Sequence, residues 1–159
     1  MIEEYARKVV GTLTQRRQTL ATAESCSGGR LAAALTGIAG ASLVFNGGLV
    51  AYSNDVKQRL LGVSEATLSE HGAVSRATAL QMATGAQQLF GVDFAVATTG
   101  VAGPGGGTAA KPVGLVFVAW ATPKGVEVTQ FSLSGSRGAI QDESVRLALK
   151  HLLELVEAD

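Results

Sequence analysis

The chain has 159 residues, which is the length of one globular domain. Hydrophobic residues make up 47% of it and charged residues 16%, a composition that excludes a disordered protein or a charged tail. The 13 basic and 13 acidic residues balance, so the basic excess of a typical nucleic-acid-binding protein is missing. We therefore expect a single domain over residues 1–159 that has no nucleic-acid partner.

Signals for metal binding and for membranes are equally sparse. Cys26 is the only cysteine, which excludes an internal disulfide, and one cysteine with two histidines cannot build an ordinary zinc site. We expect neither a metal nor a cofactor. The opening segment, MIEEYARKVVGTLTQRRQTL, lacks the apolar stretch of a signal peptide, and no apolar run approaches the roughly 18 residues of a membrane span. These features predict a cytoplasmic protein without a membrane partner.

Helices and strands alternate in the first half of the sequence. Apolar residues at helical spacing predict a helix over 2–13, and TLATAES (19–25) has the pattern of a short buried strand. The next predicted elements are a helix after the turn at 27–29, a bent strand or two short ones over 42–54, and a turn of helix over 55–62.

Caps and alternating side chains define the second half. Ser64 and Gly72 bound a short predicted helix, and Ser75 caps a longer one. The remaining predicted elements are a strand at 93–100, a glycine-rich segment at 101–112, strands at 113–122 and 126–134, and a long closing helix. This order predicts an α/β fold, namely a three-layer α/β/α sandwich with a mixed, mostly parallel sheet that contains one antiparallel hairpin.

The first candidate site follows the strand at 19–25. In open α/β sheets ligands bind beyond the carboxyl ends of the strands, and here Ser25, Cys26 and Ser27 precede Gly28 and Gly29. Small hydroxyls beside the free N–H groups of a helix start can hold an anion, or act as nucleophile and oxyanion hole. The alternative is a tight turn capped by Ser27.

The second candidate site is the glycine-rich segment that begins at Thr98 and Thr99. A loop such as Gly100-Val101-Ala102-Gly103-Pro104-Gly105 lets the backbone approach a ligand closely and can cradle a phosphate. It matches neither the Walker A pattern nor G-x-G-x-x-G, and the alternative is a flexible connection.

A serine nucleophile needs a proton acceptor, and the sequence offers a few. His151 has the position of a residue on a helix surface, and His71 that of a helix C-terminal cap. Lys57 follows a strand in an apolar part of the chain, where burial would lower its pKa and let it act as a base. Cys26 competes as nucleophile, although its alternation with Ser25 indicates a thiol that packs inward.

Five spaced segments carry a resemblance to a known family: TAESCSGG (22–29), VAYSNDVK (50–57), EHGAVS (70–75), TTGVAGPGGGTAAKPVG (98–114) and SGSRGAI (134–140). Together they resemble the CinA C-terminal domain family, over nearly the whole chain. Stand-alone bacterial members of that family include amidases that hydrolyse nicotinamide mononucleotide to nicotinate mononucleotide and ammonia. The resemblance implies this activity, a role in recycling pyridine nucleotides into NAD synthesis, and a small-molecule nucleotide as substrate.

The resemblance also implies roles for individual residues. Ser25 would be the nucleophile and Lys57 its base, with Tyr52 and Thr99 supporting the pair and Arg137 holding the substrate phosphate. The remaining residues expected to contact the substrate are Ser27, Gly28, Gly29, Asn54, Gly100 and Gly103.

Two other functions remain open at this point. Some domains of this family keep the fold without amidase activity, which would make the chain a nucleotide-binding regulatory module linked to competence or DNA damage. An amidase for a different small amide would use the same residues on another substrate. The resemblance further suggests a homodimer or a higher homo-oligomer.

Overall fold

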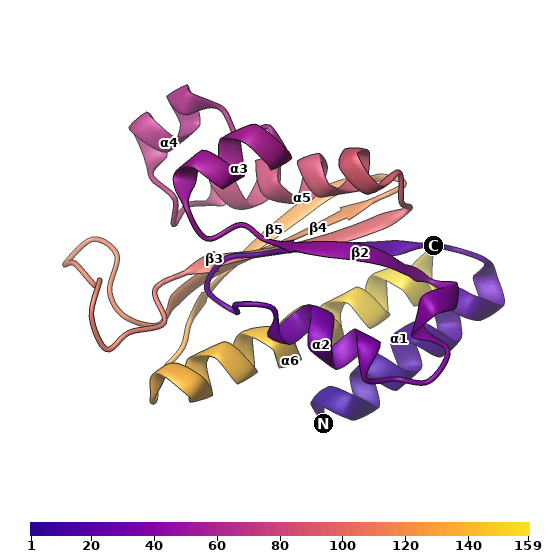
Figure 1. Cartoon of the computed structure of the whole chain (residues 1–159). Coiled ribbons are helices and arrows are strands. Elements are labelled where there is room, and N and C mark those ends of the chain that lie inside the picture. Colours follow the sequence, from indigo (N-terminus) through magenta and orange to yellow (C-terminus); the bar gives the residue numbers. More distant parts are fainter.

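One mixed sheet of five strands runs through the middle of the molecule. The computed structural model describes residues 1–159 and places helices on both faces of this sheet (Figure 1). The strands lie in the order β2 (Phe45–Val50), β1 (Leu20–Glu24), β3 (Phe94–Gly100), β4 (Leu115–Thr122) and β5 (Gly125–Ser132). β1 pairs with β2 and β3 in parallel, whereas β4 runs antiparallel to both β3 and β5. The predicted α/β sandwich with a mixed sheet is therefore confirmed, and the antiparallel part extends from the β4–β5 hairpin to the β3–β4 pair.

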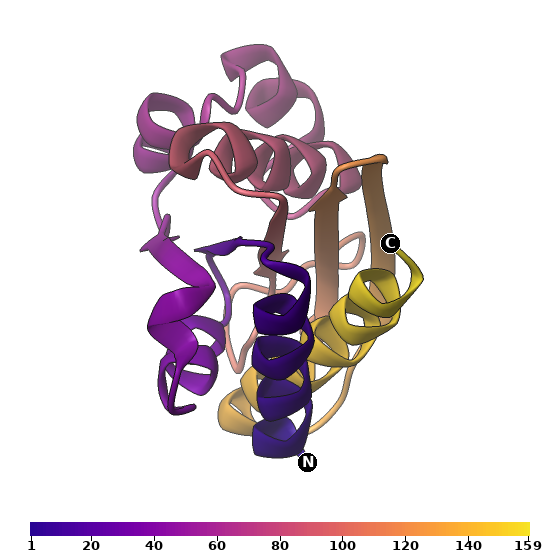
Figure 2. The same ribbon diagram turned by 90° about the vertical axis from the view of Figure 1, so that its right-hand side faces the viewer.

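The helices divide between the two faces of the sheet, as Figures 1 and 2 show. One face is covered by α1 (Ile2–Arg16), α2 (Arg30–Thr36) and α6 (Arg137–Ala158). The other carries α3 (Asn54–Leu61), α4 (Glu65–His71) and α5 (Arg76–Phe90). None of these helices is both long and apolar enough to cross a membrane.

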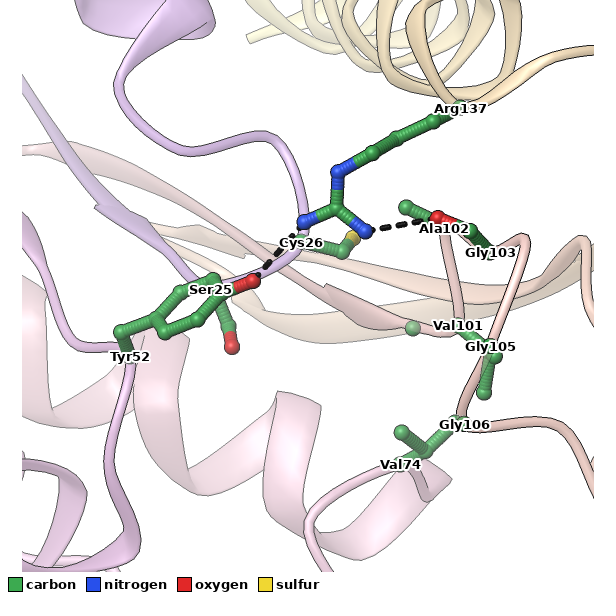
Figure 3. Close-up of a pocket in the computed structure, with 11 residues that line it drawn as sticks. Ser25, Cys26, Tyr52, Val74, Val101, Ala102, Gly103, Gly105, Gly106 and Arg137 are labelled. Carbon is green, nitrogen blue, oxygen red and sulfur yellow. Dashed lines mark hydrogen bonds between the residues drawn. The ribbon is translucent and has the colours of Figure 1, made fainter.

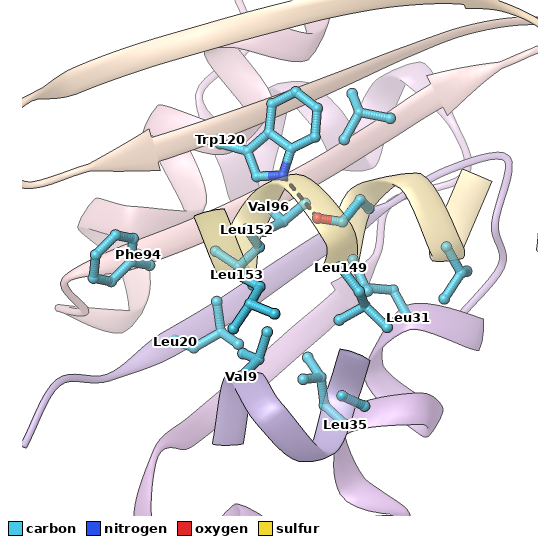
Figure 4. Close-up of a cluster of buried hydrophobic side chains, with 14 of the residues drawn as sticks. Val9, Leu20, Leu31, Leu35, Phe94, Val96, Trp120, Leu149, Leu152 and Leu153 are labelled. Carbon is cyan, nitrogen blue, oxygen red and sulfur yellow. Dashed lines mark hydrogen bonds between the residues drawn. The ribbon is translucent and has the colours of Figure 1, made fainter. Parts of the chain in front are cut away.

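Large apolar side chains fill the layer between the sheet and α6. Trp120, Phe94 and Leu20 of the sheet are fully buried there together with Leu149 of α6 (Figure 4). The indole N–H of Trp120 donates to the carbonyl oxygen of Ala148 at 3.0 Å, which satisfies the only polar atom of that side chain. Burying one such side chain contributes about 1.5–3 kcal/mol. This packing fixes α6, whose first residue is Arg137.

The opposite face of the sheet is lined by small side chains. Alanine is the main buried residue of the strands there: Ala21, Ala23, Ala95, Ala97, Ala119 and Ala121. Alanines of α5 pack against them, and α5 lies close against α3 as well. A Cβ atom on Gly85 of α5 would lie only 1.8 Å from the carbonyl oxygen of Leu61, so that contact requires glycine. The tight packing fixes α3, which carries Lys57.

The second strand is shorter than predicted, and its register with β1 shifts once, between Leu20 and Ala21. A bent strand or two short ones were expected over 42–54, but the chain forms the short 3-10 helix η1 (Ala41–Leu43) and one strand, β2, of only six residues. Gly48 does not break β2. A Cβ atom at Gly48 would lie 2.2 Å from the hydroxyl oxygen of Thr22 on β1, so the glycine allows the two strands to approach. Sequence alone treats such a glycine as a breaker, because the neighbouring strand is unknown.

Candidate active site

The carboxyl ends of three parallel strands meet at one edge of the sheet. β1 lies between β2 and β3, so the residues that follow each of these strands become neighbours there. Ser25 follows β1, Tyr52 and then α3 follow β2, and the glycine-rich loop follows β3 at Gly100. Both sites predicted from separate parts of the sequence therefore form a single site, at the position where α/β sheets usually bind ligands.

Ser25 and Lys57 are in direct contact. The Nζ atom of Lys57 lies 3.2 Å from the hydroxyl oxygen of Ser25 and 3.1 Å from the carbonyl oxygen of Tyr52. α3 begins where the hydroxyl of Ser53 accepts the N–H of Val56, and this cap starts the helix whose first turn presents Lys57. The two side chains have the contact that a serine nucleophile and a lysine base would need.

Burial prepares Lys57 for that role. The residue is only 1% exposed, and no carboxylate lies within ion-pair distance of its amine. Removing an ammonium group from water penalises its charged form, so burial lowers the pKa of Lys57 below its usual value. The expected tuning of this lysine is thus supported by its surroundings, and the neutral amine becomes more populated near neutral pH.

The neighbouring thiol is poorly suited to replace Ser25. Cys26 is 4% exposed, which agrees with the inward packing expected from the sequence. Burial raises the pKa of its thiol to about 11, so the thiol remains protonated near neutral pH. Because the thiolate is the nucleophilic form of cysteine, the hydroxyl of Ser25 beside Lys57 is the better candidate.

A cavity of about 230 Å³ opens in front of Ser25 (Figure 3). Its lining includes Ser25, Cys26, Tyr52, Val74, Gly100, Val101, Ala102, Gly103, Gly105, Gly106 and Arg137. Arg137 is the only charged residue among them, so the cavity wall carries one positive charge and no negative one. The wall favours a ligand that has an anionic part.

Arg137 spans the mouth of this cavity. Its guanidinium donates to the carbonyl oxygen of Gly103 at 2.7 Å and to the hydroxyl of Tyr52 at 3.0 Å, the two dashed lines of Figure 3. Both partners are neutral, and no carboxylate pairs with this arginine. The positive charge therefore stays available to an anion. Because Arg137 begins α6, the partial positive charge of that helix terminus reinforces it.

The glycine-rich loop contributes backbone rather than side chains. The N–H groups of Ala102, Gly103, Gly105 and Gly106 donate to no other group of the chain, although these residues line the cavity. Gly103 and Gly106 have positive φ angles, 79° and 83°, which favour glycine. A loop of this kind can direct several N–H groups toward one oxyanion or phosphate.

The turn that carries Ser25 differs from its prediction in one respect. Ser27 was considered as the cap of the following helix, but its hydroxyl donates instead to the carboxylate of Glu24 at 2.7 Å. α2 has Gly29 at its N-cap position, and the Glu24 carboxylate accepts the N–H groups of Leu31 and Ala32 in place of a cap. The helix start therefore cannot offer these two N–H groups to a substrate.

Other predicted site residues lie near the cavity without lining it. The hydroxyl of Thr99 donates to the carbonyl oxygen of Ala73 at 2.7 Å, and it bonds neither Ser25 nor Lys57. Asn54 is exposed on the first turn of α3, and Gly28 and Gly29 shape the turn with positive φ angles of 60° and 98°. Their contacts with a substrate remain predictions.

Neither histidine takes part in the site. His151 lies near the end of α6 against Trp120, with ring centroids 4.6 Å apart. His71 ends α4, and its carbonyl oxygen accepts the amine of Lys111 at 2.5 Å. Of the cavity residues, the sequence reasoning missed Val74. Glu24, which supports the turn, was also missed, although an acid ending a buried strand is an unusual signal.

Fold and site define the class first: an α/β sandwich domain with a buried serine–lysine pair at the carboxyl edge of its parallel strands. Residues 2–156 match the model of the CinA C-terminal domain, and the chain belongs to the CinA family. A CinA-like protein of Prochlorococcus marinus (strain MIT 9313) is 49% identical over 156 residues, which cover 97% of this chain and 36% of that protein. A CinA-like protein of Synechococcus sp. (strain CC9902) is 51% identical over 94% of this chain, again 36% of the relative. This chain spans about a third of the length of these curated relatives.

Solved structures give the same family. The competence/damage inducible protein CihA from Agrobacterium tumefaciens superimposes with a TM-score of 0.95 at 49% identity, over 97% of this chain and 94% of that one. A CinA superfamily protein from Klebsiella pneumoniae gives a TM-score of 0.96 at 36% identity, over 100% of this chain and 99% of that one. The fold of this chain is thus that of experimentally determined CinA-superfamily domains.

Proposed function

We propose that this protein is an amidase that hydrolyses nicotinamide mononucleotide to nicotinate mononucleotide and ammonia. The observation that carries the proposal is the 3.2 Å contact between Ser25 and the buried amine of Lys57. A structural role does not need a lysine that is 1% exposed and has only hydroxyl and carbonyl partners. Such a lysine is costly to bury, and activation of a nucleophile is a reason to keep it.

The reaction follows from these groups. The hydroxyl of Ser25 attacks the carboxamide carbon while its proton passes to the neutral amine of Lys57. When the tetrahedral intermediate collapses, the C–N bond breaks, and Lys57 returns that proton to the departing nitrogen, which leaves as ammonia. Water then attacks the resulting ester, with its proton taken by Lys57 and delivered back to Ser25.

Backbone N–H groups are the natural donors for the developing oxyanion. The N–H of Cys26, next to the nucleophile, donates to no backbone carbonyl, and the same holds for the N–H groups of Ala102 and Gly103 at the cavity wall. Removing one oxyanion donor typically costs about 10²–10³ in kcat. These amides have no backbone acceptor within the chain and are therefore the candidates for this stabilisation.

The charge of the cavity supports a nucleotide as substrate. Arg137 at the cavity mouth would bind the phosphate, and the absence of an acidic residue from the wall leaves that interaction unopposed. A substrate with a cationic ring would also keep the amine of Lys57 neutral by like-charge repulsion.

The proposal is tested by incubating the purified chain with nicotinamide mononucleotide and measuring ammonia together with the pyridine product. Ser25→Ala is the matched control, since it removes one oxygen atom from a residue that is 9% exposed. Stoichiometric ammonia and nicotinate mononucleotide from the wild type alone are expected. Binding of the nucleotide without hydrolysis would favour a regulatory module, and release of ammonia only from another amide would change the substrate.

A further inference from the structure

A buried chain of polar groups lies directly beneath the nucleophile turn. Glu24 ends β1 and is 1% exposed, Ser27 is fully buried, and so is Thr98 of β3. The hydroxyl of Ser27 lies 2.7 Å from Oε1 of Glu24 and 2.6 Å from the hydroxyl of Thr98. The proposed reaction does not use these three side chains, and burying polar groups costs free energy unless they are hydrogen-bonded.

The direction of each hydrogen bond in this chain can be assigned. Both oxygens of Glu24 face donors, because Oε1 also accepts the N–H of Leu31 at 2.8 Å and Oε2 that of Ala32 at 3.0 Å. A serine hydroxyl has one proton, and in Ser27 it is given to Glu24. The hydroxyl of Thr98 must therefore donate to Ser27. In the resulting order, Thr98 to Ser27 to Glu24, each hydroxyl proton has one acceptor.

This geometry encloses the nucleophile. Glu24 and Ser27 flank Ser25 and Cys26, so their hydrogen bond closes a loop around the nucleophile position. Thr98 holds the same turn at a second point, since its carbonyl oxygen accepts the N–H of Ser25 at 2.9 Å. Gln141 of α6 holds the turn at a third point, because its side-chain amide donates to the carbonyl oxygen of Cys26 at 3.0 Å.

We propose that Glu24 is a positioning residue, whose carboxylate, acting through Ser27 and Thr98, holds the hydroxyl of Ser25 in line with the amine of Lys57. This inference rests on the proposed function of Ser25 as nucleophile. Glu24 does not line the cavity and forms no hydrogen bond with Lys57, so its effect is exerted on the shape of the turn. A displacement of about 1 Å at a reacting atom can cost about a hundredfold in rate.

Glu24→Gln is the direct test, because a glutamine keeps the size but turns one acceptor into a donor against the N–H groups of α2. We expect kcat to fall about a hundredfold while KM changes little, as a geometric effect on the attacking atom requires. Asp93→Asn is the matched control. Asp93 accepts the N–H and hydroxyl of Thr19 at 2.8 and 3.1 Å, at the opposite ends of β1 and β3. That variant should lose stability without losing kcat.

Two variants of Thr98 test the same proposal if Glu24→Gln does not fold. Thr98→Ser keeps the donor to Ser27 and should retain kcat, whereas Thr98→Val removes it and should lower kcat without changing KM. Equal losses in both variants, or a matching loss in Asp93→Asn, would overturn the proposal and leave Glu24 a plain helix cap.

A measurement that needs no substrate tests the positioning role of Glu24 separately from the proposed amidase activity. A fluorophosphonate probe should label Ser25 of the wild type, with Ser25→Ala as blank, and label Glu24→Gln about a hundredfold more slowly. If the wild type is labelled faster than Glu24→Gln but does not hydrolyse nicotinamide mononucleotide, only the proposed substrate is contradicted. Equal labelling of wild type and Glu24→Gln, or none of the wild type, would overturn the positioning role.

Discussion

The amine of Lys57 lies 3.2 Å from the hydroxyl of Ser25, although 32 positions separate the two residues in the sequence. Their proximity is a consequence of strand order. β2 runs parallel to β1 and beside it, so the segment after β2 must turn away next to the segment after β1. Gly48 leaves room for the hydroxyl of Thr22 between these strands, and Gly85 allows α5 to pack closely against the helix that carries the lysine.

Replacing Ser25 by alanine should abolish ammonia release and leave the fold intact. Loss of a nucleophile typically lowers kcat by several orders of magnitude, and the missing hydroxyl has Lys57 as its only side-chain partner. Ammonia production and the melting temperature are the two measurements. If Ser25→Ala keeps turnover and Cys26→Ala loses it, the thiol is the nucleophile after all.

Lys57 should set the pH dependence of the reaction. Since burial lowers its pKa, kcat/KM should rise with pH through an apparent pKa below the roughly 10.4 of a free lysine. Lys57→Arg should remain inactive at every pH, because arginine stays protonated. If kcat/KM of the wild type shows no rise with pH below the pKa of a free lysine, Lys57 is not the base.

The same burial predicts a gain in stability when the lysine is removed. The unfolded chain binds a proton at Lys57 more readily than the folded one, so below the unfolded pKa this residue destabilises the fold. Lys57→Met should therefore be inactive and yet melt at a higher temperature than the wild type at pH 7. A lower melting temperature at that pH would show that the contacts with Ser25 and Tyr52 outweigh the cost of burial.

Much of this site could be predicted because its residues follow strands. Turn-forming residues behind buried segments indicate Ser25 and the loop after Gly100, and the position of Lys57 after a strand makes it one possible base. The family resemblance singles out Lys57 and adds Arg137. The orientation of single side chains could not be predicted in this way. Thr98 and Thr99 are adjacent, but their side chains lie on opposite faces of the sheet. The hydroxyl of Thr98 is hydrogen-bonded with Ser27, and that of Thr99 donates to the carbonyl oxygen of Ala73. The alternation of side chains along a strand does not show which of the two faces the nucleophile turn.

The sequence also did not predict which distant residues the charged side chains contact. Nothing near Arg137 in the sequence indicates Tyr52 or Gly103, because those contacts depend on where α6 starts relative to the sheet. The buried position of Glu24 depends on the start of α2 in the same manner. The antiparallel return of β4 along β3 also escaped prediction, since a strand carries no local mark of its neighbour.

Protonation of His151 should make the stability of the fold depend on pH. Burial opposes its charged form, but the hydrogen bonds that the imidazolium donates to the carboxylates of Glu127 and Glu154, at 2.8 and 2.9 Å, outweigh burial and raise its pKa. The contribution is complete below the unfolded pKa of about 6.5 and is lost as the pH rises through the higher folded value. Because the imidazole is partly exposed, we expect no more than about 1 kcal/mol. Melting temperatures of wild type and Glu127→Gln should differ at pH 5.5 and converge at pH 8.5.

Arg137 should discriminate nucleotide from nucleoside. Its guanidinium already donates to Gly103 and Tyr52, so a phosphate would bind to a group held in place rather than to a free side chain. Losing a hydrogen bond to a charged group costs about 1.5–3 kcal/mol, or roughly tenfold to 150-fold in kcat/KM. Most of that loss should be in KM, because the phosphate is remote from the amide and is held equally in the ground and transition states.

The measurement compares nicotinamide mononucleotide with its phosphate-free nucleoside on wild type and Arg137→Ala. The wild type should strongly prefer the nucleotide, and the variant should lose most of that preference while its rate on the nucleoside changes little. Tyr52→Phe is the matched control, because it removes one tether of the guanidinium and leaves the charge in place. If Arg137→Ala impairs both substrates equally, the phosphate is bound elsewhere, and the free N–H groups of Gly105 and Gly106 become its better partners.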